Sequence, residues 1–93
     1  MKKYSIKLSN EAKKDIKILK KAGDKQALNK LKELMKELKK DPRKGKGRPK
    51  HLKYFPGNVW RRKITDKHRL VYEIFENIVM VEVIQAFGHY KDK

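Results

Sequence analysis

The 93-residue sequence contains no cysteine, has only 11 acidic residues, and lacks a long apolar segment. Without cysteine, disulfides and thiolate metal sites are excluded, and a reducing compartment is compatible with the composition. No apolar run approaches the roughly 20 residues of a membrane-spanning helix. The Met1-Lys2-Lys3 start also lacks the apolar core of a signal peptide. We therefore expect a cytoplasmic protein with no membrane association.

The scarcity of acidic residues leaves a large excess of positive charge. Lysine and arginine number 27, so the formal net charge is +16. Such an excess predicts long-range attraction to polyanions, above all nucleic acid. Hydrophobic residues still make up 38% and recur in periodic order, which indicates a folded domain rather than a basic tail. The length fits one domain, residues 1–93, without an internal repeat.

The first half of the sequence predicts a strand and two helices. Residues 4–8 alternate between apolar and polar, which is typical of a half-buried strand. Ser9 can cap a helix that ends at Gly23, and Asp24 can cap a second helix that ends at Asp41-Pro42. Because the connection between them is so short, the two helices should form an antiparallel hairpin.

The second half has the period of strands. After a loop rich in Gly and Lys at 43–50, strands are predicted at 51–55, 59–65, 68–75 and 78–87, with turns between them. The last is the longest apolar run, and we expect it at the centre of the sheet. The predicted class is α+β: an N-terminal strand, a helical hairpin, and a four-stranded antiparallel meander with the helices on one face.

Basic side chains occur within the predicted strands, where they are unusual. The stretch from Trp60 to Tyr72 reads WRRKITDKHRLVY, and GHY stands at 88–90. This stretch predicts a cationic strand, a turn and a second strand that begins with a cation. Such an arrangement indicates a sheet that holds an anion. Histidine at 89 adds a side chain that titrates near neutral pH. The combination points to chemistry on a phosphate, the repeating unit of nucleic acid.

These segments resemble the YoeB/Txe branch of the RelE superfamily, toxins of bacterial toxin-antitoxin pairs, over nearly the whole chain. The loop Gly45-Lys46-Gly47-Arg48-Pro49 is similar to that family's Gly-x-Gly-Lys-Pro segment. The other matching segments are Leu52-Lys53, Trp60-Arg61-Arg62-Lys63-Ile64-Thr65, His68-Arg69-Leu70-Val71-Tyr72 and His89-Tyr90. The resemblance implies a RelE-like fold and a ribosome-dependent endoribonuclease that cuts mRNA in the A site without a metal or other cofactor. The implied partners are a cognate antitoxin, the ribosome with its mRNA, and a second copy of the chain.

In that chemistry the ribose 2′-OH attacks the adjacent phosphate and the 5′-oxygen leaves. The resemblance assigns Arg69 to stabilising charge on the phosphate, because a guanidinium fork fits two of its oxygens. His89 is the predicted general acid, Tyr90 orients the nucleotide, and Lys53 supplies a second cation. The basic residues predicted to bind substrate are Lys46, Arg48, Arg62 and Lys63.

One position departs from the family pattern. The family usually has a Glu directly after the loop proline, assigned as general base, and here that residue is Lys50. Lys50 can act as a base only if its pKa falls well below the usual ~10.4, which neighbouring cations would favour. The alternatives are His51, a base supplied by the ribosome, or a weakened enzyme. A smaller departure is that residues 91–93 extend past His89-Tyr90.

Other interpretations remain open. A strand arginine such as Arg69 is often simply paired with a nearby carboxylate, here Glu73 or Asp66. Trp60 is better explained as part of the core or of a subunit interface than as a platform for bases. Two other functions also fit the composition: inhibition of DNA gyrase by binding, as in ParE-type relatives, and a basic nucleic-acid-binding module without activity. His89 and Arg69 favour the enzyme, whereas Lys50 favours the alternatives.

Overall fold

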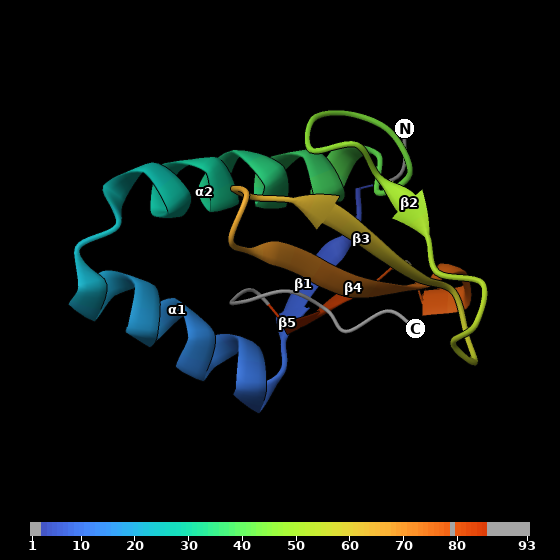
Figure 1. Ribbon diagram of the computed structural model, residues 1–93. Helices are drawn as coiled ribbons and strands as arrows, with labels where there is room; N and C mark the ends of the chain where they lie inside the picture. Colours follow the sequence, from blue (N-terminus) through green and yellow to red (C-terminus); the bar gives the residue numbers. More distant parts are fainter. Residues whose placement is uncertain (1–2, 79, 86–93) are drawn as a thin grey trace.

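A sheet and a helical hairpin make up the computed structural model, which describes residues 3–78 and 80–85 (Figure 1). The helices are α1 (Asn10–Ala22) and α2 (Lys25–Lys40), with one 3-10 turn, η1 (Glu76–Ile78). The strands are β1 (Ser5–Leu8), β2 (Lys50–His51), β3 (Val59–Lys63), β4 (Arg69–Phe75) and β5 (Met80–Gln85). Within the described ranges, neither helix is long and apolar enough to span a membrane.

Local capping interactions define both helices, as predicted. The Ser9 hydroxyl accepts a hydrogen bond from the Ala12 amide at 3.0 Å, and the Asp24 carboxylate accepts one from the Ala27 amide at 3.1 Å. Gly23 ends α1 by donating its amide to carbonyls of the last turn. These short-range contacts place α1 and α2 as a hairpin, whose turn lies on the same side of the molecule as the β3–β4 turn (Figure 1).

The sheet has the strand order β1-β5-β4-β3-β2. The predicted antiparallel meander from β2 to β5 is confirmed, and β1 joins it in parallel with β5. The prediction that the last strand is central is wrong. The meander runs in chain order and β1 adds beyond β5, so β4 is the middle strand.

The segment after β2 also differs from the prediction. A strand was expected over residues 51–55, but β2 covers only Lys50 and His51. Leu52 instead turns inward and is buried against Val59 and Val71. Its carbonyl then accepts the amide of Phe55 at 3.3 Å, which curls the chain into a turn. Pairing with β3 thus ends at Leu52, whose amide still donates to the Val59 carbonyl at 2.8 Å, and the turn follows.

The two faces of the sheet have different neighbours. Leu70, Tyr72 and Ile74 alternate along β4 and pack with buried leucines of α1 and α2 to form the main core. Val71 points the other way, where among the described residues only a small apolar cluster forms. The helices therefore cover one face of the sheet, and the predicted α+β class is confirmed.

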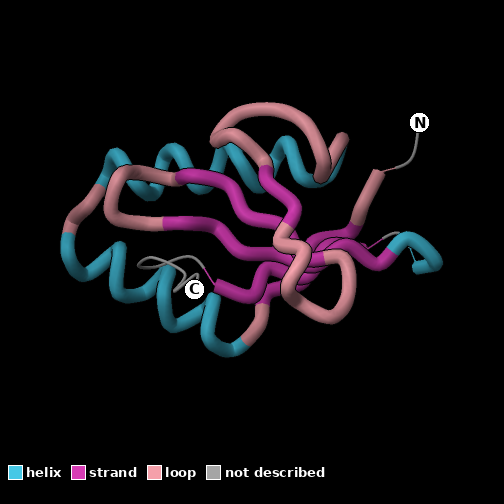
Figure 2. The backbone as a smooth tube through the Cα atoms, turned by 45° about the vertical axis from the view of Figure 1, so that its right-hand side comes forward, coloured by secondary structure: helices cyan, strands magenta, loops and turns pink. Residues whose placement is uncertain are grey.

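A buried arginine fixes the loop between α2 and β2. Arg62 on β3 has no exposed surface, and each of its five N–H groups has an acceptor. Nε donates to the Tyr72 hydroxyl at 3.1 Å, and Nη1 to the Glu37 carboxylate at 2.8 Å. The other acceptors are main-chain carbonyls of the loop: Lys46 at 3.2 Å, Asp41 at 2.9 Å and Lys44 at 2.7 Å. Figure 2 shows this loop arching back beside α2 before it enters β2.

Two further bonds complete the attachment of the loop. The Tyr72 hydroxyl donates to the Pro42 carbonyl at 2.6 Å. Burial raises the pKa of Tyr72, although the Arg62 guanidinium opposes that shift, so the hydroxyl remains protonated and able to donate. At the other end of the loop, the Lys63 amide donates to the Gly47 carbonyl at 2.6 Å. The residues that follow Gly47 are thereby held beside β3.

We expect Arg62→Met to lower the free energy of unfolding by about 3–5 kcal/mol, because it leaves a partly buried carboxylate and three loop carbonyls without their donor. Arg43→Met is the matched control. Arg43 pairs with Glu76 where both side chains are substantially exposed, and such pairs contribute at most about 1 kcal/mol. Urea denaturation of both variants measures the difference. Equal losses would mean that Arg62 does not anchor the loop.

Candidate phosphate-binding site

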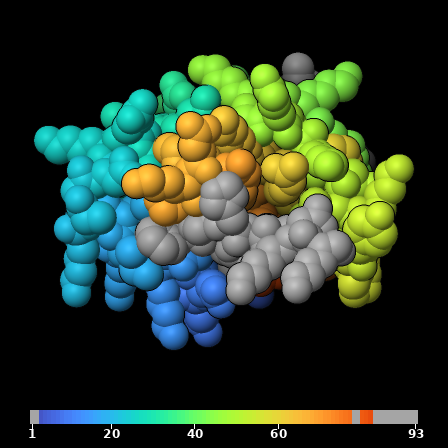
Figure 3. Space-filling view, in the orientation of Figure 1, coloured from blue at the N-terminus to red at the C-terminus, as the bar shows by residue number. Residues whose placement is uncertain are grey.

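Basic side chains surround a hollow of about 470 Å³ beside β3. We call it the cationic hollow. Its lining residues are Gly47, Arg48, Pro49, Lys50, Arg61, Lys63 and Arg69. Five of these are basic, and none of the described lining residues is acidic. Figure 3 shows the loop after α2 (green) next to the β3 and β4 segments (yellow to orange). A hollow with this lining is suited to an anion.

The strand register brings these cations together. Lys50 of β2 lies opposite Arg61 of β3, and Lys63 of β3 lies opposite Arg69 of β4. Residues two apart on a strand project from the same face, so Arg61 and Lys63 share one side of the sheet. Like charges placed directly opposite one another destabilise a sheet. Gathering two such pairs therefore costs stability, and a bound anion would relieve the repulsion.

Arg69 is positioned by main-chain carbonyls of the β3–β4 turn. Its Nη1 donates to the Thr65 carbonyl at 2.7 Å and to the His68 carbonyl at 3.2 Å. The alternative of an ion pair with Asp66 is not what the contacts show, because the Asp66 carboxylate lies 2.6 Å from the Lys63 ammonium. The turn thus holds the Arg69 side chain in place without neutralising its charge.

The ion pair between Lys63 and Asp66 lies at the surface. The Lys63 side chain is 45% exposed and that of Asp66 is 91% exposed. Exposed pairs of this kind contribute little, about 0–1 kcal/mol, because water and salt screen them. A phosphate entering the hollow could therefore take the place of the Asp66 carboxylate at low cost.

Four residues predicted from the sequence meet in the hollow: Arg48, Lys50, Lys63 and Arg69. Arg62 does not, and its assignment to substrate binding needs correction because its guanidinium is buried beneath the loop. Arg61 lines the hollow instead. The alternation of side chains along β3 could have revealed this, since Arg61 and Lys63 share a face that Arg62 must leave.

Three other candidate residues, Lys46, Lys53 and His51, are not among the described residues that line the hollow. The Lys46 ammonium is 3.7 Å from the Glu33 carboxylate of α2, and Lys53 is exposed in the turn after β2. The His51 ring stacks on Trp60, with 5.2 Å between ring centroids. Because neighbouring strand residues face opposite ways, His51 points away from the side that Lys50 occupies. His89 and Tyr90 lie outside the described residues.

Trp60 has the structural position expected of it, and His68 is also part of the packed structure. Trp60 is half-buried against the main core, as predicted, and its indole N–H donates to the Asn58 side chain at 2.8 Å. His68 is buried in the β3–β4 turn, where its carbonyl accepts the amides of Ile64 and Thr65. Within residues 3–78 and 80–85, no three His, Asp or Glu side chains form a group that could hold a metal ion.

Comparison with known proteins identifies relatives over nearly the whole chain. The family model described as YoeB-like toxin of bacterial type II toxin-antitoxin system matches residues 8–90. Toxin YoeB of Escherichia coli K12 is 38% identical over 58 residues, which are 62% of this chain and 69% of the relative. Toxin YoeB of Streptomyces coelicolor is 34% identical over 68 residues, or 73% and 79% of the two chains.

Solved structures show the same fold. A YoeB/ParE toxin from Agrobacterium tumefaciens superposes with a TM-score of 0.84 at 29% identity, covering 92% of this chain and 99% of the other. The YoeB dimer from Staphylococcus aureus gives 0.81 at 28% identity, with 95% and 99% covered. The heterotetrameric YoeB-YefM toxin-antitoxin complex from the same organism gives 0.77 at 30% identity, with 94% and 98% covered. The fold expected from the sequence resemblance is confirmed.

We predict that Gly47→Ala weakens binding of single-stranded RNA. Gly47 has φ +82°, and an added Cβ would lie 2.8 Å from the Lys63 carbonyl oxygen, so the loop must move off β3. Gly57→Ala is the control, because Gly57 has φ +89° but would meet only the flexible Glu73 side chain outside the hollow. Both variants should lose stability, roughly 1–2 kcal/mol, from left-handed strain. Fluorescence anisotropy should show weaker binding for Gly47→Ala alone; equal affinities would contradict the role of the loop.

Proposed function

This chain belongs to the YoeB-like toxins of bacterial type II toxin-antitoxin systems, and on that premise we propose that it is an endoribonuclease that cleaves mRNA in the ribosomal A site. The observation that supports this most directly is the cationic hollow, in which five basic side chains converge. The reaction we propose is attack of the ribose 2′-OH on the adjacent phosphate, with departure of the 5′-oxygen.

The hollow suits the charge that this reaction develops. Negative charge builds up on the phosphate oxygens as the 2′-oxygen bonds to phosphorus, and fixed cations stabilise it best when they need not reorganise. Arg69 meets that condition because turn carbonyls already hold its side chain. Its planar fork can bind two oxygens at once, while Lys50 and Arg61 stand close enough to line the same hollow.

Two proton transfers remain to be assigned. The family resemblance supports His89 as the acid that protonates the leaving 5′-oxygen and Tyr90 as the residue that orients the nucleotide. For the base, the position of Lys50 in the hollow favours it over His51, whose ring packs on Trp60. We therefore propose that Lys50 removes the 2′-OH proton or, if the ribosome supplies the base, binds the phosphate.

The composition of the hollow also supports dependence on the ribosome. None of its described lining residues is aromatic, so these residues offer no surface on which to stack and align bases. We propose that the ribosome presents the mRNA in the reactive geometry and that the +16 charge draws the toxin to ribosomal RNA in the cytoplasm.

The relatives indicate the protein partners. The Staphylococcus aureus YoeB structures are a dimer and a complex with YefM. By analogy, a cognate antitoxin binds this chain, and the toxin forms a homodimer. An acidic antitoxin segment lying over the cationic hollow would neutralise it and block access of RNA.

Arg69→Ala should slow single-turnover cleavage of ribosome-bound mRNA by roughly 100- to 1000-fold, because it removes a preorganised charge stabiliser. Lys17→Ala on α1, an exposed lysine outside the hollow, removes the same charge and should leave the rate unchanged. The products should end in a 2′,3′-cyclic phosphate or a 3′-phosphate.

Several outcomes would count against the proposal. Wild-type rates from both Arg69→Ala and His89→Ala would exclude the enzymatic function. Equal cleavage of naked and ribosome-bound mRNA would remove the ribosome from the mechanism. Gyrase inhibition without mRNA scission would favour the ParE-type alternative, and RNA binding without either activity would favour a binding module.

Lys50→Ala should lower the cleavage rate on the ribosome, whereas Lys44→Ala, in the same loop but outside the hollow, should not.

Lys50→Glu, which restores the usual family residue, should also lower the rate. A carboxylate beside Arg48 and Arg61 would be held ionised by ion pairs, and its depressed pKa would make it a poor base. A faster Lys50→Glu variant would show instead that the natural chain is a weakened enzyme.

A further inference from the structure

The cationic hollow continues past the end of β3. A second hollow of about 330 Å³ is lined by Lys30, Gly47, Arg48, Lys63 and Ile64. A third, of about 520 Å³, is lined by Asp24, Gln26, Lys30, Lys63, Ile64, Thr65, Asp66 and Lys67. Lys63 lines all three hollows, and Lys30 lines the second and third. We call the second and third hollows together the side groove.

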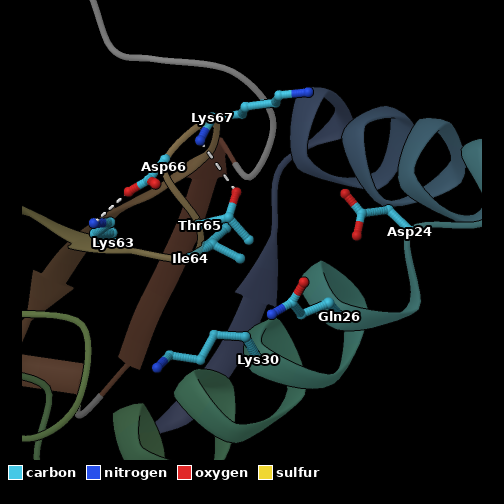
Figure 4. Close-up of a pocket in the computed structure, with 8 residues that line it drawn as sticks. All are labelled: Asp24, Gln26, Lys30, Lys63, Ile64, Thr65, Asp66 and Lys67. Carbon is cyan, nitrogen blue, oxygen red and sulfur yellow. Dashed lines mark hydrogen bonds and ion pairs between the residues drawn. The ribbon is translucent and has the colours of Figure 1, made fainter.

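The side groove has two walls from different parts of the chain. Figure 4 shows the β3–β4 turn on one side and the first turns of α2 on the other. Lys30 extends from α2 toward the side on which Lys63 lies, whereas Asp24 and Gln26 lie nearer the start of the helix. A single strand of nucleic acid that leaves the cationic hollow past Lys63 would therefore meet Lys30 next.

The charges of the side groove favour an anion. Its basic side chains are Lys30, Arg48, Lys63 and Lys67. The two carboxylates among its described lining residues are engaged: Asp24 accepts the Ala27 amide as the cap of α2, and Asp66 pairs with Lys63. Within the described part of the chain, Lys30 has no carboxylate partner. A half-buried lysine in a groove, free of an ion pair to the described residues, is available to a bound phosphate.

We propose that the side groove binds the phosphate backbone of the RNA strand on one side of the cleaved bond, with Lys30 as its outer contact. This inference rests on the proposed function, because the strand must pass through the cationic hollow. The lining favours RNA over an acidic protein segment. Among the described residues its apolar side chain, Ile64, is itself buried, so this lining offers none of the exposed apolar anchors that a protein partner requires. Backbone phosphates need only cations and hydrogen-bond donors.

The test compares Lys30→Gln with Lys17→Gln. Both lysines lie inside helices, and each change removes one positive charge, but Lys17 lies outside the side groove. The probe is a fluorescent single strand with 2′-O-methyl groups, which the proposed reaction cannot cut because its nucleophile is blocked. Lys30→Gln should weaken binding several-fold and reduce the slope of log K against log salt by about 0.7. Lys17→Gln should leave that slope unchanged.

A dinucleotide, which occupies only the cationic hollow, should bind both variants equally. Thermal melting should confirm that both are folded, since Lys30 contributes no ion pair among the described residues. If both variants bind the long strand equally more weakly than the wild-type chain, the effect is one of general charge, and the proposal is overturned. The proposal would also be overturned if poly-glutamate competed with the RNA strand for binding and its own binding depended on Lys30 in the same way.

The binding test separates this proposal from the proposed function. If the wild-type chain cleaves mRNA on the ribosome but Lys30→Gln binds the long strand normally, the side groove is excluded and the enzyme remains. If Lys30 controls binding of the long strand while no cleavage occurs on the ribosome, the nuclease is excluded and the RNA-binding groove remains.

Discussion

The buried guanidinium of Arg62 is the interaction on which the candidate site depends. Taking an arginine out of water is costly, and the cost is offset only where every donor finds a good acceptor. Arg62 achieves this with a carboxylate from α2, a hydroxyl from β4 and three carbonyls of the loop between them. Before β2 begins at Lys50, the backbone of the loop is bonded to a strand at Gly47, whose carbonyl accepts the Lys63 amide of β3. A buried cation therefore helps to set the position of Arg48 and Lys50, the exposed loop cations that line the cationic hollow.

The exposed and half-buried cations of the hollow show the opposite balance of forces. Lys50 opposite Arg61, and Lys63 opposite Arg69, repel one another across the sheet. Water and salt weaken this repulsion at the surface, so the fold tolerates it. An anion bound in the cationic hollow would relieve the repulsion that remains. The Asp66 carboxylate partly fills that role in the free protein by pairing with Lys63.

The features of the fold that local contacts determine were predicted best from the sequence. The caps Ser9, Gly23 and Asp24 act within a few residues of themselves, so both helices and their hairpin could be read directly. The pairing of β1 with β5 joins distant segments, and no local pattern specifies it. The early end of β2 was missed because the turn from Leu52 to Phe55 forms where Leu52 packs on Val59 and Val71, which are distant in sequence.

The candidate site was predictable in part for similar reasons. Arg48, Lys50, Lys63 and Arg69 were found from motifs, and Arg61 could have been found from the alternation along β3. The burial of Arg62 could not, because it requires the loop to fold back over the sheet. The predicted roles of His89 and Tyr90 fall outside the described residues.

The parallel pairing of β1 with β5 has a consequence for the synthesis of the toxin. β1 is translated before both helices, and β5 is translated after β4. The edge of the sheet that β1 forms beside β5 therefore cannot form until nearly all described elements exist. Until then the core that covers the leucines of α1 and α2 lacks Val81 of β5. The nascent toxin therefore completes its fold late, after the ribosome that made it has translated β5.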